Sequence, residues 1–336
     1  MYELKFSILI PTYNGGEVLG ETIRSILAQE FDNYEIIIND DVSKDNTEEV
    51  VKSFNDPRIK FFRNAKNLSY AVNIEEGRKQ CSGDIIYLMG QDDIMSDTAL
   101  IDTYNAFMSD ENIGAVTRPY FWFDTDINTP VRAKNQFNPN KDEVIKITDD
   151  YESVEKVFRT LDQLSWLAYR VKYMDIGFHP DCFPSHIYPW VSIFKNHPIV
   201  YLKDYNIAVR IASSQTRYIS SIYEKSPMLS RIEMINNVLT GDQFKDLRKK
   251  LIQNFIATNY VWLPQLRNYA RYYVFIREVW YLLKYRPQNV FSLGFWFFSV
   301  GCAVMPANLL IKLVDWYKNK ILSKTLIKIK FNYKLK

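Results

Sequence analysis

Cysteine is scarce in this chain, which has only Cys81, Cys182 and Cys302 among its 336 residues. The three are far apart, odd in number, and never form a Cys-x-x-Cys pair. Disulfide frameworks and structural zinc sites depend on paired, closely spaced cysteines, so the sequence argues against both. We therefore expect a reducing compartment. The first residues lead directly into an apolar run without the h-region of a secretory signal, so we expect the front of the chain to remain in the cytosol.

Two glycine-rich phosphate-binding motifs are also missing. The first apolar run is followed by PTYNGG (residues 11–16) where a dinucleotide-binding fold has GxGxxG, and no GxxxxGK[ST] occurs anywhere. A nucleotide bound by this chain would need another partner for its phosphates. Carboxylates that hold a divalent cation are the common alternative.

Charge is distributed unevenly along the chain, although the net charge is only +3. Residues 1–225 contain 24 Lys and Arg against 34 Asp and Glu, whereas residues 226–336 contain 18 against 5. The front is therefore acidic and the rear basic, and the rear is also rich in aromatic residues. Such a division predicts two regions with separate tasks, the second of which meets an anionic surface.

Short apolar runs alternate with helical patterns in the first 110 residues. Apolar runs predict strands at residues 6–10, 34–38, 59–62 and 85–89. Apolar residues at helical spacing lie between them, for example over residues 19–27. This alternation predicts an α/β fold with a doubly wound, mostly parallel sheet.

Two of the predicted strands end in adjacent carboxylates. Asp40 and Asp41 follow the second strand, and Asp92 and Asp93 follow the fourth. Ligands of open α/β sheets bind beyond the carboxyl ends of the strands, and adjacent carboxylates repel each other unless a cation lies between them. The pattern predicts a Mg²⁺ or Mn²⁺ site at Asp92 and Asp93. The alternative is a solvated turn that caps the helix predicted over residues 98–108.

Four blocks within residues 6–100 resemble the nucleotide-sugar-binding half of family 2 glycosyltransferases, which have the GT-A fold. The blocks are SILIPTYN (7–14), IINDDVSKDNT (37–47), NLSYAVN (67–73) and GDIIYLMGQDD (83–93). Four blocks in this order and spacing are more specific than any one of them. The resemblance implies an inverting, metal-dependent transfer from a nucleoside-diphosphate sugar, by family habit a UDP-sugar.

The same resemblance implies roles for individual residues. Pro11, Tyr13 and Asp41 would line the base pocket, with Asp41 accepting a hydrogen bond from a base N–H. Asp92 would hold the ribose or a water on the metal, and Asp93 would bind the cation. The complete implied donor-binding set is Pro11, Tyr13, Asn14, Asp40, Asp41, Asn73 and Asp92.

The chain departs from the family pattern at two positions. Gly90 stands where the leading Asp of the Asp-x-Asp signature is usual, and Val42 stands where Gly usually follows the second-strand acids. The first change removes one contact to the ribose or metal but keeps the two adjacent acids.

The acceptor half should supply a base that deprotonates the acceptor hydroxyl. Counted back from the strand predicted at 199–202, the usual base falls near residues 185–187, where His186 is the ionisable group. Asp181 lies a little earlier and has the family's usual chemistry. Either can serve if its pKa is suitable, and we prefer Asp181. His179 and His186 could instead bind the metal, or be polar residues of a Pro-rich loop.

The expected domains are a GT-A catalytic domain over residues 1–222 and a helical, membrane-associating region over residues 223–336. The first divides into a nucleotide-binding half (1–110) and an acceptor half (111–222). Within the acceptor half, the polar residues 124–150 predict a long loop, either a lid that contacts the acceptor or a solvated insertion.

The basic rear contains a long uncharged stretch, residues 287–311, that is dense in Phe, Trp, Leu and Val. It is long enough to span a bilayer, but Pro306 interrupts it, and the tail after it, residues 312–336, carries eight Lys. A single span would put this basic tail outside, against the positive-inside tendency. We therefore expect a helix lying in the interface, or a re-entrant hairpin, at the cytoplasmic face of the cell membrane. A buried core helix is the alternative.

The sequence thus predicts a glycosyltransferase whose partners are a nucleoside-diphosphate sugar, a lipid-linked or growing surface glycan, and the inner membrane surface. Two other classes stay open. One is an inactive, membrane-bound scaffold of a glycan-assembly complex, suggested by Gly90 and the missing usual base. The other is a basic, aromatic binder of lipid surfaces or nucleic acid, but the uncharged stretch speaks against nucleic acid as a partner.

Overall fold

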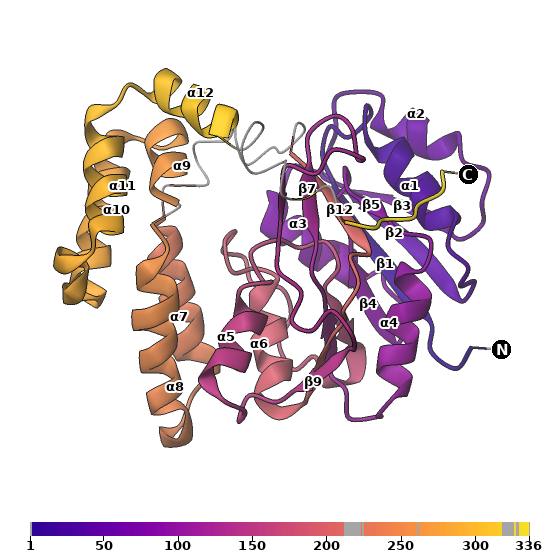
Figure 1. The fold of residues 1–336 in the computed structure, drawn as a ribbon. Coiled ribbons are helices and arrows are strands. Elements are labelled where there is room, and N and C mark those ends of the chain that lie inside the picture. Colours follow the sequence, from indigo (N-terminus) through magenta and orange to yellow (C-terminus); the bar gives the residue numbers. More distant parts are fainter. Residues whose placement is uncertain are drawn as a thin grey trace. The chain divides into compact units, whose positions relative to one another are not determined.

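The computed structural model describes residues 2–211, 223, 225–260, 262–317, 326 and 329–335. The chain forms two compact units (Figure 1). The first consists of Met1–Ser213 together with Leu326–Lys336, and the second of Ser214–Thr325. The helical region expected from the sequence ran to residue 336, whereas the structure assigns the last eleven residues to the first unit.

An eight-stranded sheet forms the centre of the first unit, in the order β3-β2-β1-β4-β10-β6-β11-β9. Its strands are β1 (Phe6–Thr12), β2 (Tyr34–Asp40), β3 (Ile59–Arg63), β4 (Ile85–Leu88), β6 (Ala115–Thr117), β9 (Glu143–Ile145), β10 (Ala168–Arg170) and β11 (Ile199–Tyr201). The first four are parallel, as predicted. The acceptor half makes the sheet mixed, because β10 runs antiparallel to both β4 and β6 and β9 runs antiparallel to β11.

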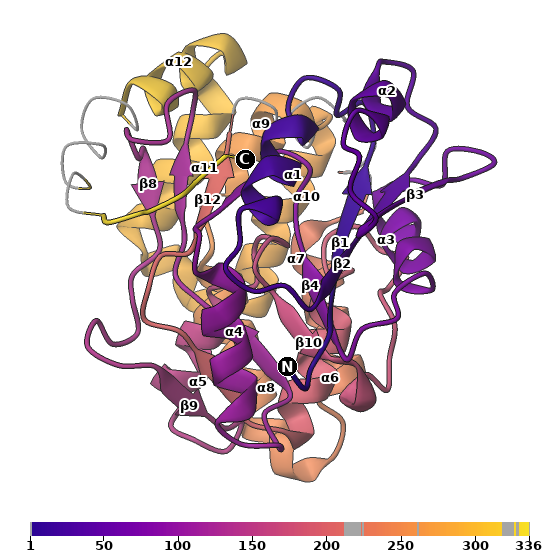
Figure 2. The same ribbon diagram turned by 90° about the vertical axis from the view of Figure 1, so that its right-hand side faces the viewer.

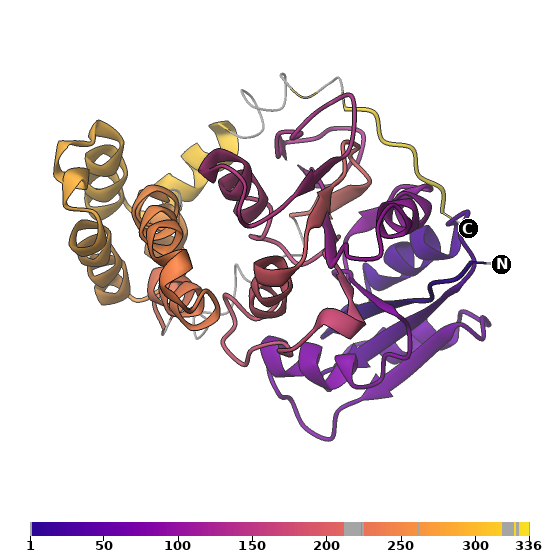
Figure 3. The ribbon, with the colours of Figure 1, turned by 90° about the horizontal axis from the view of Figure 1, so that it is seen from below.

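Helices lie on both sides of this sheet (Figures 2 and 3). They are α1 (Leu19–Leu27), α2 (Thr47–Lys52), α3 (Tyr70–Arg78), α4 (Ala99–Met108), α5 (Tyr151–Phe158) and α6 (Ile187–Asn196). In α1, the apolar residues Leu19, Ile23 and Ile26 share one face and are fully buried. The sequence periodicity therefore identified both the helix and its core side.

Glu35 fastens the amino ends of the parallel strands. From β2, its carboxylate accepts hydrogen bonds from Ser7 Oγ of β1 at 2.6 Å and from Ser82 N at 2.7 Å. It also pairs with Lys60 of β3 at 2.7 Å. Burial by itself would raise the pKa of Glu35, but the hydrogen bonds from Lys60, Ser7 and Ser82 outweigh it and lower the pKa to about 2.

A second, four-stranded sheet lies in the order β5-β12-β7-β8. Its strands are β5 (Ile94–Met95), β7 (Phe121–Phe123), β8 (Arg132–Ala133) and β12 (Ile207–Arg210). The prediction of one long loop over residues 124–150 is therefore wrong, because β8 and β9 both fall within it. Tyr205 Oη also donates to Lys134 O at 2.7 Å, which fixes this segment to the connection before β12.

The last described residues of the chain pack against this second sheet. Ile329, Phe331 and Tyr333 contact its buried cluster, and the ring centroid of Phe331 lies 5.1 Å from that of Phe121. Lys334 Nζ lies 3.5 Å from Asp97 Oδ2. Residues 329–335 are thus part of the first unit, which corrects the prediction that they belong to a basic tail of the helical region.

Helices make up most of the described residues of the second unit. They are α7 (Pro227–Val238), α8 (Lys245–Lys250), α9 (Trp262–Tyr269), α10 (Tyr272–Tyr285), α11 (Leu293–Val304) and α12 (Ala307–Tyr317). The uncharged stretch 287–311 is divided among a 3₁₀ turn at Pro287–Phe291, α11 and the start of α12. Within the described part of the chain, no helix combines the length and the apolar character needed to cross a bilayer.

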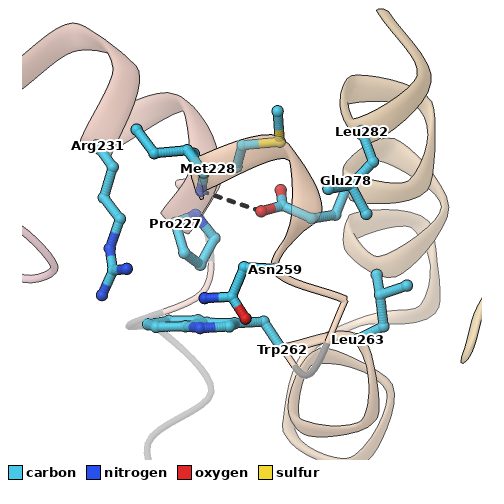
Figure 4. A pocket seen from close by; sticks show the side chains of 9 residues that line it. Pro227, Met228, Arg231, Asn259, Trp262, Leu263, Glu278 and Leu282 are labelled. Carbon is cyan, nitrogen blue, oxygen red and sulfur yellow. Dashed lines mark hydrogen bonds between the residues drawn. The ribbon is translucent and has the colours of Figure 1, made fainter. Parts of the chain in front are cut away.

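A small cavity of about 20 Å³ lies among α7, α9 and α10 (Figure 4). Arg231, Asn259 and Glu278 are among the polar residues that line it. Glu278 accepts a hydrogen bond from Met228 N at 3.0 Å and another from Ser226 Oγ at 2.5 Å. Burial raises the pKa of Glu278. The space is sufficient for about one water molecule. Glu278 therefore serves to join α10 to the first turn of α7, and the cavity is far too small for a nucleotide sugar.

Candidate active site

The acid pairs lie at the ends of β2 and β4, which flank β1 in the parallel part of the sheet. Thr12, the last residue of β1, pairs with Asp40, the last residue of β2. On the other side of β1, Leu9 pairs with Leu88 at the end of β4. Because parallel strands end at the same edge, the loops after β1, β2 and β4 meet there. We call residues 90–93, which follow β4, the acid loop.

Asp41 lies in a network of asparagine side chains. Its Oδ1 accepts hydrogen bonds from Asn64 Nδ2 at 2.9 Å and from Leu68 N at 2.7 Å. Asn64 Nδ2 also donates to Asn73 Oδ1, and Asn73 Nδ2 donates to Asn39 O. Among the residues that the structure describes, these donors bond to Oδ1 of Asp41 and not to Oδ2. The network therefore fixes the carboxylate while leaving one oxygen for a ligand N–H.

Gln91 of the acid loop holds the backbone of Tyr13. Its Oε1 accepts from Tyr13 N at 2.9 Å, and its Nε2 donates to Tyr13 O at 3.2 Å. Pro11, two residues earlier, is buried in β1. This amide clamp joins the loop after β1, which carries Tyr13, to the loop that carries Asp92 and Asp93.

Asn14 and Asp40 are held in turns. Asn14 N donates to Ser43 Oγ at 2.7 Å, and its side-chain oxygen accepts from Lys44 N at 2.8 Å. Asp40 is fully buried, accepts hydrogen bonds from the N–H and hydroxyl of Ser43, and lies 3.3 Å from Arg63 Nη1. These two predicted donor-binding residues therefore use their polar groups to shape the turn beside Asp41.

Val42 has a left-handed backbone, with φ of +65°. Glycine adopts this conformation readily, whereas a β-branched residue is strained in it. The position where the resemblance leads one to expect glycine therefore keeps the conformation that glycine favours. Strained backbone of this kind concentrates at functional sites.

Asp93 is buried, with 5% of its surface exposed, and both of its carboxylate oxygens are held. Oδ1 accepts from Arg210 N at 3.0 Å, and Oδ2 accepts from the hydroxyl of Ser165. Burial raises the pKa of Asp93 well above its usual value, and the negative charge of Asp92 raises it further, against the hydrogen bonds from Ser165 and Arg210. A cation at this carboxylate would relieve the cost of its charge.

The rest of the acid loop is held from two other segments, α1 and β12. Thr22 of α1 donates its hydroxyl to the backbone oxygens of Gln91 and Asp93, both at 2.9 Å. Arg210 of β12 donates Nε to Asp92 O at 3.1 Å and pairs with Glu21. The Asp92 side chain is only half-buried. The loop thus has a fixed backbone, and the Asp92 side chain is the less buried of its two carboxylates.

Gly90 is explained by this arrangement. A Cβ atom at residue 90 would lie 2.7 Å from Asp93 Oδ2 and 3.0 Å from Ser165 Oγ. Gly90 N also donates to Ser165 Oγ at 2.6 Å. Ser165 therefore occupies the space that a side chain at residue 90 would need, and an aspartate there would add a third negative charge to the pair.

The two carboxylates of Asp92 and Asp93 suit a divalent cation that also binds a substrate. Within the described ranges, no cluster of three or more His, Cys, Asp or Glu side chains that could hold a metal occurs. Mg²⁺ commonly takes only one or two protein carboxylates and completes its shell with waters and substrate phosphates. Asp92 and Asp93 match that share, so the prediction of a metal at these residues is chemically consistent with the structure.

The two candidate bases differ in their surroundings. His186 is buried just before α6, its Nε2 lies 3.2 Å from Leu161 O, and its backbone oxygen accepts from Tyr169 Oη. Asp181 is half-buried, and its N–H donates to Nδ1 of His179, whose ring stacks on Tyr188. None of these contacts joins either candidate directly to the acid loop. Asp181 is the more accessible of the two.

Sequence reasoning missed several residues that hold the site. Gln91 lies inside the block 83–93, but the resemblance implies no role for it. Asn39 and Asn64 look in the sequence like ordinary polar residues of turns. Ser165 and Arg210 gave no signal, because they reach Asp93 from 72 and 117 residues away along the chain.

The front of the chain is similar to known glycosyltransferases. A match to glycosyl transferase family 2 covers residues 7–160. Over 100 residues the chain is 37% identical to a GalNAc(5)-diNAcBac-PP-undecaprenol beta-1,3-glucosyltransferase of Campylobacter jejuni, covering 29% of this chain and 32% of that one. Over 90 residues it is 39% identical to the UDP-Glc:alpha-D-GlcNAc-diphosphoundecaprenol beta-1,3-glucosyltransferase WfgD of Escherichia coli, covering 26% and 35%. The match therefore spans about a third of the length of these relatives.

The crystal structure of Staphylococcus aureus TarS 1–349 in complex with UDP superimposes with a TM-score of 0.61. It covers 99% of this chain and 97% of that one, at 16% identity. At this identity the likeness concerns the fold, which is the GT-A α/β sheet followed by a helical region. Residues 7–160 of this chain therefore match the model of glycosyl transferase family 2.

Proposed function

We propose that this chain transfers a sugar from a nucleoside-diphosphate sugar to a lipid-linked or growing surface glycan, with inversion at the anomeric carbon. The observation that carries the proposal is the clamp between Gln91 and Tyr13. It joins a base pocket at Asp41, which retains a carboxylate oxygen for an N–H, to the acid pair at Asp92 and Asp93. A nucleoside diphosphate presents those two chemistries, a base N–H at one end and anionic phosphates at the other.

The proposed donor is a UDP-sugar. Asp41 Oδ2 would accept the N–H of uracil, while the Asn64 amide keeps the carboxylate oriented. WfgD is named as an enzyme that uses UDP-Glc, and TarS has been solved with UDP. Asp92 and Asp93 would hold Mg²⁺ or Mn²⁺, which would neutralise the negative charge of the departing diphosphate.

The proposed reaction is a single in-line displacement. An oxygen of the acceptor hydroxyl forms a bond to the anomeric carbon while the bond from that carbon to the diphosphate oxygen breaks. The hydroxyl proton passes to a base, and the nucleoside diphosphate leaves with the bonding electron pair. The fixed acid loop would stabilise the charge that develops on the leaving group more than the charge of the bound donor, which is the condition for catalysis.

Asp181 is the proposed base, and His186 the alternative. The half-buried position of Asp181 supports this choice, because a base must come within hydrogen-bond reach of the incoming hydroxyl. His186 is buried against Leu161 O and is placed better to support the loop that carries Ser165.

The proposed acceptor class follows the names of the relatives. Both transferases described above act on sugars linked through diphosphate to undecaprenol. An acceptor of this kind would place the reaction at a membrane, and we propose its cytoplasmic face. The free state of Cys81, Cys182 and Cys302 is consistent with a reducing compartment.

The first test is the thermal stabilisation of the full chain by a panel of nucleoside diphosphates, with and without Mn²⁺. We expect stabilisation by UDP that depends on Mn²⁺ and is lost in Asp92→Asn. This variant is preferable to Asp93→Asn because the Asp92 side chain is half-buried, whereas Asp93 is buried. Asp110→Asn, at an exposed turn, is the matched control.

Three outcomes distinguish the possibilities. Metal-dependent UDP binding followed by turnover of a UDP-sugar supports the proposal, and Asp181→Asn should then lower kcat with little change in donor affinity. UDP binding without turnover of any donor supports the inactive scaffold. No stabilisation by any nucleotide would overturn the transferase assignment.

A further inference from the structure

The outward face of α11 is entirely apolar and exposed. Leu293, Phe297, Val300 and Val304 follow one another at intervals of four, three and four residues, so they share one face of the helix. Leu293, Phe297 and Val304 are 88%, 74% and 76% exposed. Phe291, just before the helix, is 88% exposed. Large contiguous apolar surfaces are rare on soluble monomers and mark interaction sites.

The opposite face of α11 is packed within the helical unit. Phe295, Ser299 and Cys302 are buried, and the Phe295 ring centroid lies 5.7 Å from that of Tyr260. Arg267 Nε of α9 donates to Cys302 O at 3.0 Å. The helix is therefore held in place by its inner side, which packs within this unit. The apolar outer side is a second, separate surface of the helix.

The neighbouring helices present aromatic and basic side chains. α10 and α12 both pack on α9, as α11 does. The exposed residues on these two helices include Tyr273, Ile276, Trp280 and Lys284 of α10, and Leu309, Lys312, Leu313 and Trp316 of α12. Lys284 Nζ lies 5.0 Å from the Trp280 ring. Trp, Tyr and Lys combined with apolar residues are typical of helices in the membrane interface.

We propose that α11 inserts its outward face into the interfacial region of a bilayer that contains anionic lipids, with the helix axis parallel to the membrane plane. Its 12 residues span only about 18 Å, whereas the hydrocarbon core is about 30 Å thick, so the helix lies in the membrane surface. The proposal does not rest on the transferase activity, because it concerns residues outside the catalytic unit.

Charge selects lipid as the occupant over a second copy of this chain. Residues 214–325, which form the helical unit, contain 16 Lys and Arg against 6 Asp and Glu, so two copies of this region would repel each other. An anionic bilayer attracts the same region, and its acyl chains accept the side chains of Leu293, Phe297 and Val304, which offer no hydrogen-bonding group.

The test is co-sedimentation of the full chain with vesicles of phosphatidylcholine alone and with vesicles that also contain about 30% phosphatidylglycerol, an anionic content sufficient for a strong surface potential. We expect binding to the anionic vesicles that weakens as salt is raised. The double variant Leu293→Asp with Phe297→Asp should bind at least about tenfold more weakly, because it places two charges in the apolar interface.

Val144→Asp is the matched control, since Val144 is an exposed apolar residue of β9 in the other unit, and it should bind as the wild type does. Phe291→Asp replaces the double variant if circular dichroism shows the latter to be unfolded. The proposal would be overturned if the double variant bound as well as the wild type. It would also be overturned if the wild type did not bind to anionic vesicles. An oligomer that the substitutions dissociate, without vesicle binding, would instead identify a contact between copies. UDP binding should stay unchanged in all of these variants, so a failure here is separable from a failure of the proposed function.

Discussion

Replacing Ser165 by alanine should weaken both the fold and the acid pair. The Ser165 hydroxyl accepts the Gly90 N–H at 2.6 Å and donates to Asp93 in a buried site. The variant leaves the Gly90 N–H without this partner, which costs about 1–3 kcal/mol for a buried donor. For a unit of this size, about 2–4 °C is lost per kcal/mol, so we expect the melting temperature to fall by roughly 2–12 °C.

The same variant should weaken metal-dependent nucleotide binding. The Ser165 hydrogen bond favours the charged form of Asp93, which burial and the neighbouring Asp92 oppose. A cation needs that charged form, so loss of a hydrogen bond to a charged group, about 1.5–3 kcal/mol, should lower Mn²⁺ affinity in the presence of UDP by roughly tenfold or more.

The assay is a Mn²⁺ titration at fixed UDP concentration, followed by the shift in melting temperature. Ser185→Ala is the control, because the buried Ser185 hydroxyl has no hydrogen-bond partner in the described part of the chain. It should leave both readouts near wild type. A Ser165→Ala protein with wild-type stability and Mn²⁺ dependence would refute the assignment of Ser165 as the residue that positions Asp93.

Three further perturbations follow from the structure. Folding lowers the pKa of Glu35 from 4.5 to about 2, so its charged form contributes about 3 kcal/mol to the unfolding free energy above pH 4.5. This contribution is lost as the pH falls toward 2. Glu35→Gln should therefore flatten that part of a plot of unfolding free energy against pH without changing UDP binding. Gly90→Ala should lower stability and abolish metal-dependent UDP binding, whereas Gly301→Ala, where a Cβ meets nothing within 4 Å, should be tolerated in the same assays. Phe331→Ala should destabilise the first unit by about 1–3 kcal/mol in urea denaturation. This is less than the loss for a fully buried Phe, because Phe331 is half-exposed. An equal effect of Leu335→Ala would contradict the packing of Phe331 against the second sheet.

The C-terminal segment shows how composition can hide a structural pattern. Ile329, Phe331 and Tyr333 alternate with Lys330, Asn332 and Lys334, which is the period of a strand with one side buried. The many lysines of the tail favoured a membrane-surface interpretation instead. The structure buries the apolar set in part against the second sheet, and the polar set points to solvent.

The long uncharged stretch shows a different limit. Its composition predicted a segment that meets a membrane, but length and hydrophobicity alone could not say where helices begin and end. Pro306 prevents a continuous helix because it lacks an N–H donor and its ring clashes with the preceding turn. The structure accordingly ends α11 at Val304 and begins α12 at Ala307.

The sequence by itself determined the parallel half of the sheet and the position of both acid pairs. These depend on local periodicity and on the rule that parallel strands end at one edge, and these two regularities are enough to assign Asp41 and Asp93 to that edge. Only the tertiary structure decided what holds them there. Ser165 and Arg210 approach Asp93 from distant segments, and no local spacing encodes such contacts, because they exist only once the acceptor half has folded beside β4.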